Sequence, residues 1–152
     1  MTELDAHRCF RAVLAALSMP GRPQASPVPR DRTPALILRS IWEPDQGGDA
    51  VRVVHGDPGP RLLEDVPRGT EAEPQLGGTV VLVAGPGGPR TPVWLAGPGL
   101  RETTPTVLPL SPAALESRAR ACADPPAGVD LVIVTADGSI VGLPRTTRVE
   151  IG

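Results

Sequence analysis

The chain has 152 residues, of which 15 are basic and 17 are acidic, so its formal net charge at neutral pH is −2. This length is sufficient for one domain whose hydrophobic core needs no disulfide or metal ion, and the charge lacks the basic excess that is typical of nucleic-acid-binding proteins. All of the basic residues are arginines. Because lysine is absent, mechanisms that need an internal lysine are excluded, among them the Schiff base with pyridoxal phosphate and the lysine of a phosphate-binding loop.

The N-terminal part of the chain predicts an amphipathic helix. Its apolar residues recur at the i, i+3, i+4 and i+7 positions of one helix face, and the helix is expected to end at Pro20. These apolar residues are Phe10, Val13, Leu14 and Leu17.

A proline-rich segment at residues 21–34 separates this helix from a second one. Proline disfavours both a helix interior and a central strand, so this segment is expected to run over the surface in an extended conformation. Thr33 then predicts a helix N-cap, with Pro34 as the first residue of a helix over residues 35–42.

The middle of the chain is rich in β-branched residues. Residues 51–54 predict a short strand. Residues 79–84 and 91–95 form two further β-branched runs, and the sequence GPGGPR between them predicts a hairpin with a glycine-containing loop.

The C-terminal part predicts a helix and a second hairpin. Ser111 and Pro112 favour a helix N-terminus, with the helix extending to about residue 123. The nearly continuous apolar run at residues 129–134 is typical of a strand that is covered on both faces, and the turn residues at 136–138 join it to a strand at 139–143. We therefore expect an α/β fold, a layered mixed sheet with flanking helices, in a single domain over residues 1–152.

Two glycine-proline clusters, at residues 84–89 and 96–100, were weighed as phosphate-binding motifs. Neither completes the GxGxxG pattern or leads directly into a helix, so both are expected to be surface loops. The pairs His7 with Cys9 and His55 with Asp57 lack the additional ligands of a metal site, and we expect no metal and no cofactor.

The sequence favours a protein of the reducing cytoplasm. Cys9 and Cys122 are far apart in the chain and are expected to be reduced thiols. The N-terminal sequence MTELDAHRCF is acidic and polar, unlike a signal peptide, and no apolar run is long enough to span a membrane.

The best candidate for chemistry is the segment PRTTR near the C-terminus. Arginine presents a rigid fork of donors that suits phosphate or phosphonate oxygens, and the threonines add hydroxyl groups. The same alternation of residues is equally typical of a half-exposed strand, so the segment is either an anion- or partner-contact site or a packing strand. The candidate contact residues are Arg145, Thr146, Thr147 and Arg148.

Several segments, in this order, resemble the PhnH family, the H subunit of the bacterial carbon–phosphorus lyase complex. They are FRAVLAALSMPG at residues 10–21, RGTEAEPQLGGTVVLV at 68–83, LAGPGL at 95–100, PAGVDLVIV at 126–134 and LPRTTRVEI at 143–151. Compared with that family, one strand–helix unit is missing near residues 43–50, which would expose a sheet edge or an apolar helix face.

The resemblance implies a fold like the large domain of pyridoxal-phosphate-dependent aminotransferases, without the cofactor site. It also implies an accessory, non-catalytic subunit that works with the G, I and J subunits when a phosphonate is coupled to the ribose of ATP with release of adenine. No catalytic residue is carried over to this chain. A homodimer, a free-standing phosphonate- or nucleotide-binding protein, and a divergent copy without complex activity are left open.

Overall fold

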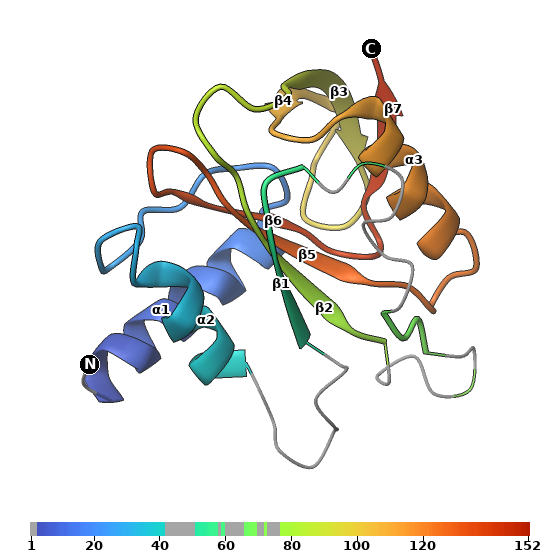
Figure 1. The fold of residues 1–152 in the computed structure, drawn as a ribbon. Helices are drawn as coiled ribbons and strands as arrows, with labels where there is room; N and C mark the ends of the chain where they lie inside the picture. The colour runs from blue at the N-terminus through green and yellow to red at the C-terminus, as the bar shows by residue number, and fades with distance from the viewer. Residues whose placement is uncertain (1–2, 42–50, 58, 60–65, 70–71, 73–76) are drawn as a thin grey trace.

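The computed structural model describes residues 3–41, 51–57, 59, 66–69, 72 and 77–152. In this part of the chain, helices and strands follow one another in a mixed α/β arrangement, which confirms the predicted fold class (Figure 1). In chain order they are α1 (Glu3–Ser18), α2 (Thr33–Ile41), β1 (Val51–His55), β2 (Thr79–Val83), β3 (Thr91–Ala96), β4 (Thr104–Leu108), α3 (Pro112–Ala121), β5 (Asp130–Val134), β6 (Ile140–Leu143) and β7 (Arg148–Ile151).

The central sheet has the strand order β1-β2-β5-β6. Strands β1, β2 and β5 are parallel, and β6 returns antiparallel to β5 through the turn at residues 135–139. The predicted C-terminal hairpin is therefore confirmed. Residues 131–134 of β5 and all of β6 are buried, as the continuous apolar run predicted for a strand that is covered on both faces.

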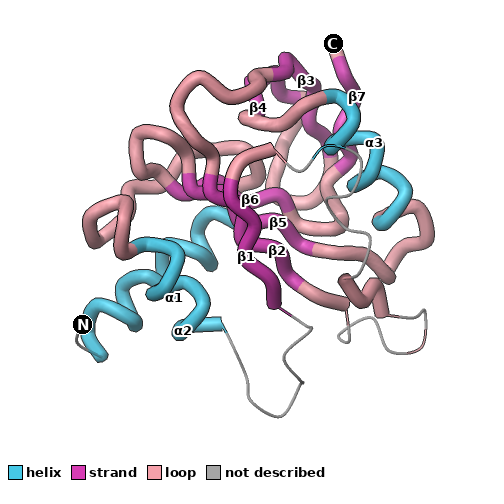
Figure 2. Tube along the Cα trace, viewed as in Figure 1, coloured by secondary structure: helices cyan, strands magenta, loops and turns pink. Residues whose placement is uncertain are grey.

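Different elements cover the two faces of the central sheet. Helices α1 and α2 lie on one side of the strands, whereas α3 and the second sheet lie on the other (Figure 2). The side chains of each strand alternate between these two layers. The core on the helix side contains Cys9, Val13, Ala16, Leu36, Ile37, Val81, Val132, Val134 and Ile140. The core on the other side includes Val80, Leu82, Val93, Leu95, Leu108, Leu115, Leu131, Ile133, Val141 and Leu143.

Helix α1 buries only part of the predicted stripe. Val13 is buried and Leu17 packs against the core, as predicted, whereas Phe10 and Leu14 are 38% and 48% exposed. Cys9 and Ala16 are buried instead of these two residues. The reason lies at Gly142 of β6, where an added Cβ would overlap the backbone of Ala16. Because the helix packs this closely on the strand, its small residues must face the sheet.

The other two helices were predicted to begin at caps, and the structure supports only one of these caps. Ser111 caps α3, because its Oγ accepts a hydrogen bond from the amide of Ala114 at 3.2 Å. Thr33 lies inside α2 as its first residue, and its hydroxyl group bonds to the carbonyl of Pro29 at 3.1 Å, so it does not precede the helix as predicted.

The predicted hairpin of residues 79–84 and 91–95 is wrong. Strand β2 pairs with β1 and β5, whereas β3 belongs to a separate antiparallel sheet with the order β4-β3-β7. The loop between them carries the chain from one sheet to the other. Strand β4 was not predicted, since it contains Pro105, and it lies at the edge of its sheet, where proline is tolerated.

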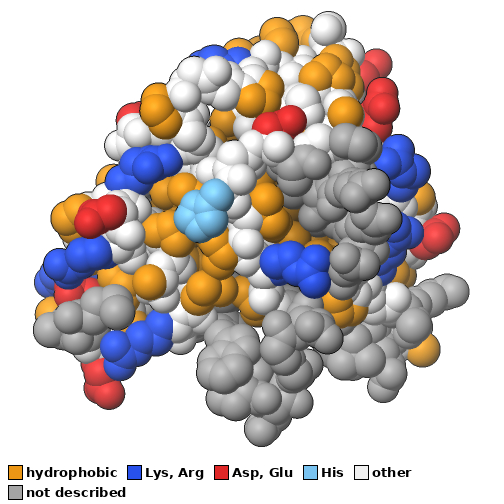
Figure 3. All heavy atoms as spheres, viewed as in Figure 1, with side chains coloured by type: hydrophobic (Ala, Val, Ile, Leu, Met, Phe, Trp, Pro, Cys, Tyr) orange, Lys and Arg blue, Asp and Glu red, His pale blue; other side chains and the backbone are white. Residues whose placement is uncertain are grey.

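Strand β1 is one of the two edge strands of the central sheet among the residues that the structure describes. Its residues 51–54 are half-buried, and hydrophobic side chains reach the surface around this strand (Figure 3). The strand–helix unit that the family resemblance implies to be missing would fall near residues 43–50, which lie outside the described residues. The effect of the missing unit on this edge stays a prediction.

None of the described helices is long and apolar enough to cross a membrane.

Candidate functional site

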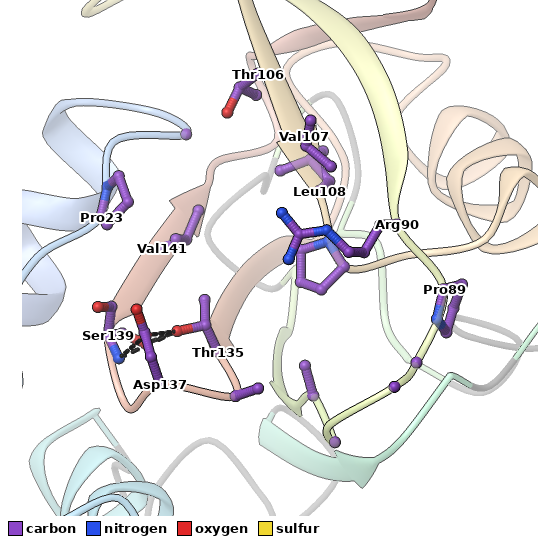
Figure 4. Close-up of a pocket in the computed structure, with 17 residues that line it drawn as sticks. Pro23, Pro89, Arg90, Thr106, Val107, Leu108, Thr135, Asp137, Ser139 and Val141 are labelled. Atoms are coloured by element: carbon purple, nitrogen blue, oxygen red, sulfur yellow. Dashed lines mark hydrogen bonds between the residues drawn. The ribbon is translucent and has the colours of Figure 1, made fainter.

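A cleft of about 340 Å³ lies at the carboxyl ends of β2 and β5 (Figure 4). Its walls are the loop at residues 84–90, the turn at 135–139, strand β4 at 106–108 and the connection that follows α1. The cleft therefore lies between the central sheet and the second sheet. In open α/β sheets, ligands bind in the crevice outside the carboxyl ends of the strands, which makes this cleft the candidate site.

One wall of the cleft carries an uncompensated positive charge. Arg90 follows the glycine-rich loop GPGGP, and its side chain extends into the cleft (Figure 4). Within the described part of the chain, no residue forms a hydrogen bond or ion pair with Arg90. Gly85, Gly87 and Gly88 precede it and line the same wall with exposed backbone, which a ligand can approach closely.

The opposite wall carries a fixed carboxylate. The hydroxyl of Thr135 and the backbone amide of Ser139 both donate hydrogen bonds to Oδ1 of Asp137, the latter at 3.0 Å (Figure 4). The hydrogen bond from Thr135 is the largest cause that lowers the pKa of Asp137 to about 2, followed by those from Ser139. Asp137 is therefore ionised at every physiological pH.

A second arginine lies behind the floor of the cleft. Nε of Arg30 donates to the carbonyl of Thr135 at 3.1 Å, and its Nη2 donates to the carbonyl of Ala84. These carbonyls follow the last residues of the parallel strands β5 and β2, so Arg30 ties the two strand ends together. Its positive charge adds to that of Arg90 and raises the electrostatic potential of the cleft.

The arrangement is suited to binding and orienting a ligand. Arginine donors and exposed backbone on one wall fit an anionic group, while the carboxylate on the other wall fits a cation. Among the residues that the structure describes, no three His, Cys, Asp or Glu side chains gather as ligands for a metal ion.

The structure places the predicted residue Arg145 at the opposite end of the central sheet. Asp130 begins β5, and its carboxylate accepts a hydrogen bond from the backbone amide of Arg145 at 2.8 Å and forms an ion pair with the Arg145 guanidinium at 3.1 Å. The same guanidinium donates to the carbonyl of Gly77 at 3.4 Å. Arg145 thus fastens the chain after β6 to the amino ends of the parallel strands.

Thr147 is buried beside a buried arginine of α3. One Nη of Arg118 donates to the carbonyls of Pro144 and Thr147, each at 2.8 Å. Burial lowers the pKa of Arg118, although Cys122 and Asp130 act in the opposite direction. The side chain of Arg118 is only 3% exposed.

The side chains of the four candidate residues at 145–148 therefore do not converge on one anion-binding site. Arg145 and Thr147 have packing contacts, while Thr146 and Arg148 are exposed, the latter as the first residue of β7. A contact role for these residues stays a prediction.

The two residue pairs considered above as metal ligands have other surroundings. In the pair His7 with Cys9, burial raises the pKa of Cys9 to about 11. In the pair His55 with Asp57, the carboxylate of Asp57 accepts a hydrogen bond from the amide of Ser111 at 3.2 Å.

Sequence reasoning missed Arg90 and Asp137 as a pair. It assigned Arg90 to a hairpin loop and Asp137 to a turn. Asp137 does lie in the turn between β5 and β6, whereas Arg90 lies in the connection from β2 to β3, which belong to different sheets. The available signal was that both residues lie in segments that follow buried β-branched runs, since loops after parallel strands meet at one edge of a sheet. This signal was lost because β2 was expected to pair with β3.

A family match covers most of the described fold. A family model described as "Bacterial phosphonate metabolism protein (PhnH)" matches residues 49–150, which include every described strand up to Glu150 in β7 and the two cleft segments that carry Arg90 and Asp137. Helices α1 and α2 precede the matched region, so the segment at residues 10–21 is not part of the match. No curated protein sequence matches the chain. On the family match, which covers well over half of its residues, the chain belongs to the PhnH family of bacterial phosphonate metabolism proteins.

Proposed function

We propose that the protein is an accessory, non-catalytic subunit of the carbon–phosphorus lyase core complex in the bacterial cytoplasm. In this role it works with the G, I and J subunits when a phosphonate is coupled to the ribose of ATP and adenine is released. The observation that carries the proposal is the family match over residues 49–150, because it spans both sheets and α3. The likeness to the large domain of aminotransferases remains part of this proposal.

An exposed apolar sheet face supports the role of a contact subunit. The register of β3 and β4 places Trp94 opposite Pro105 and Pro92 opposite Val107, so these four side chains share one face of the second sheet, which we call the Trp94 face. Trp94 and Val107 are each 45% exposed. Large exposed apolar side chains that are grouped in this way are typical of an interaction site.

Charged residues border the Trp94 face. Strand β7 places Glu150 opposite Trp94 and Arg148 opposite Ala96, so both charged side chains belong to the same face. An apolar centre with a polar rim is the usual composition of a protein–protein interface. We propose that Arg148 makes its partner contact here, as part of this rim.

Co-purification with the G, I and J subunits of the same organism, measured by native mass spectrometry, tests the proposal. We expect a complex of defined stoichiometry that Trp94→Ser weakens. Leu14→Ser is the matched control, because Leu14 is similarly exposed, at 48%, but lies on α1, on the other side of the central sheet. A folded chain that binds none of the three subunits would contradict the proposal and favour a divergent copy.

The cleft favours a second candidate function, a free-standing binder of phosphonate or nucleotide. Its uncompensated Arg90 and glycine-rich wall are the supporting observations. Calorimetry of the isolated protein with methylphosphonate and with ATP distinguishes the two functions, since an accessory scaffold needs no such affinity. A homodimer is compatible with either function, and native mass spectrometry of the isolated chain determines it.

A further inference from the structure

We infer that the cleft at the carboxyl ends of β2 and β5 binds a small zwitterion, whose anionic group contacts Arg90 and whose ammonium group contacts Asp137. The two-charge recognition stands on the geometry of the cleft. The choice of a phosphonate as the anionic group rests on the proposed function, so the expected ligand class is the aminoalkylphosphonates.

The anionic end of the ligand follows from the wall that carries Arg90. Since no described residue pairs with this guanidinium, its full charge and its donors are available to a ligand. Arg30, which is held by the carbonyls of Ala84 and Thr135, adds a second positive charge just behind the lining. The cleft therefore has two nearby positive charges against one carboxylate, which suits an anion with more than one negative charge.

The cationic end follows from the turn at residues 135–139. The hydrogen bonds from Thr135 and Ser139 are both accepted by Oδ1 of Asp137, and they fix the position of the carboxylate without neutralising it. Because the pKa of Asp137 is lowered to about 2, the carboxylate is negative at physiological pH, at which an alkylamine is protonated. A primary ammonium group supplies donors of the matching charge.

The walls explain why a ligand of both charges is favoured over a simple anion. A ligand with an anionic group alone would place no charge against Asp137, whereas a zwitterion satisfies both walls at once. The cleft volume of about 340 Å³ is at the lower end of the usual range for ligand sites, which suits a small molecule. Val107, which is 45% exposed, lines the cleft near Arg90 and offers apolar surface for a short alkyl linker (Figure 4).

Calorimetry on the full chain tests this inference with three probes, 2-aminoethylphosphonate, ethylphosphonate and β-alanine. Asp137→Asn is the informative variant, because asparagine retains the Asx-Gly turn chemistry and removes only the charge. We expect it to weaken 2-aminoethylphosphonate about tenfold, as for loss of one charge-assisted hydrogen bond, and to leave ethylphosphonate unchanged. Arg90→Gln is expected to weaken both probes, and Arg90→Lys to restore part of the affinity.

Matched controls lie outside the cleft. Asp124→Asn and Arg120→Gln change exposed residues near the end of α3 and should leave all affinities unaltered. If ethylphosphonate binds as tightly as 2-aminoethylphosphonate, if Asp137→Asn has no effect, or if no probe binds, the inference is overturned. If β-alanine binds as well as 2-aminoethylphosphonate, the two-charge recognition is supported and the assignment to phosphonates is overturned.

The outcome is separable from that of the proposed function. Val107 borders both the cleft and the Trp94 face, but Trp94, the residue changed in the co-purification test, does not line the cleft, and neither Arg90 nor Asp137 belongs to the Trp94 face. Assembly without binding of any probe would overturn only the cleft inference. Binding without assembly would overturn only the accessory role.

Discussion

Replacing Arg145 by alanine should destabilise the protein, whereas replacing Arg148 should not. Arg145 pairs with Asp130 through Nη2 at 3.1 Å and Nε at 3.3 Å, and it donates a further hydrogen bond to the carbonyl of Gly77. These contacts join the segment after β6 to the amino end of β5 and to the residue before the buried Gly78. Arg148 is exposed at the start of β7, and it serves as the matched control.

The magnitude follows from the exposure of the ion pair. The side chains of Arg145 and Asp130 are 16% and 23% exposed, so the pair is neither a surface bridge nor fully buried. Exposed pairs contribute about 0–1 kcal/mol, while loss of one partner from a buried pair costs about 3–5 kcal/mol, so after allowing for solvent screening we expect a loss of about 2 kcal/mol. For a chain of this size that corresponds to a fall in Tm of about 4–8 °C.

Urea unfolding and calorimetry of Arg145→Ala, Asp130→Asn and the double variant measure the effect. Because the two residues contact each other, the double variant should lose less stability than the sum of the single variants. An Arg145→Ala protein that unfolds at the parental Tm but no longer assembles would refute the packing role and support the anion- or partner-contact role. Equal losses for Arg145→Ala and Arg148→Ala would refute the distinction between the two arginines.

The remaining predictions concern the turn, the closest helix–strand contact and the buried arginine. Thr135→Val removes the main hydrogen bond to Asp137 and should raise the pKa of Asp137 from about 2 toward its ordinary value of 3.8, as measured by an NMR titration. Since that pKa is lowered in the folded protein, the stabilisation from the Asp137 carboxylate is present above its ordinary pKa and is lost as the pH falls toward 2. A Thr135→Val protein in which Asp137 still titrates near 2 would contradict this account. Gly142→Ala should cost about 1–3 kcal/mol in urea unfolding, because the added Cβ overlaps the backbone of α1, and unchanged stability would show that the helix shifts freely. Arg118→Met leaves two carbonyls without their donor and should cost about 1–3 kcal/mol, while a stability gain would mean that desolvation of the charge outweighs its hydrogen bonds.

Much of the local structure could be predicted from the chain alone. The hairpin of β5 and β6 was predicted correctly because a continuous apolar run, an Asp-Gly turn and a second apolar run lie close together in sequence. The N-terminus of α3 was likewise predicted correctly, since the hydroxyl of Ser111 needs only the amide of Ala114 three residues later. In both cases, neighbouring residues supply all the interactions.

The cleft and the packing of the candidate segment depended on contacts that are distant in sequence. The partner of Arg145 lies on β5, and Arg90 and Asp137 line the same cleft because the parallel strands β2 and β5 lie side by side. Sequence patterns did not show that β3 pairs with β4 and β7, because a β-branched run has the same alternation whichever strand lies beside it.

The sequence by itself therefore determined most of the helices and strands, the absence of lysine chemistry and the resemblance to the PhnH family. Only the tertiary structure decided which face of α1 is buried, since that choice depends on how closely Ala16 approaches Gly142. The tertiary structure also decided that Arg145 pairs with Asp130 and that Arg90 lines the cleft. Local propensity acts over a few residues, whereas the surroundings of a side chain are determined by whatever the fold packs against it.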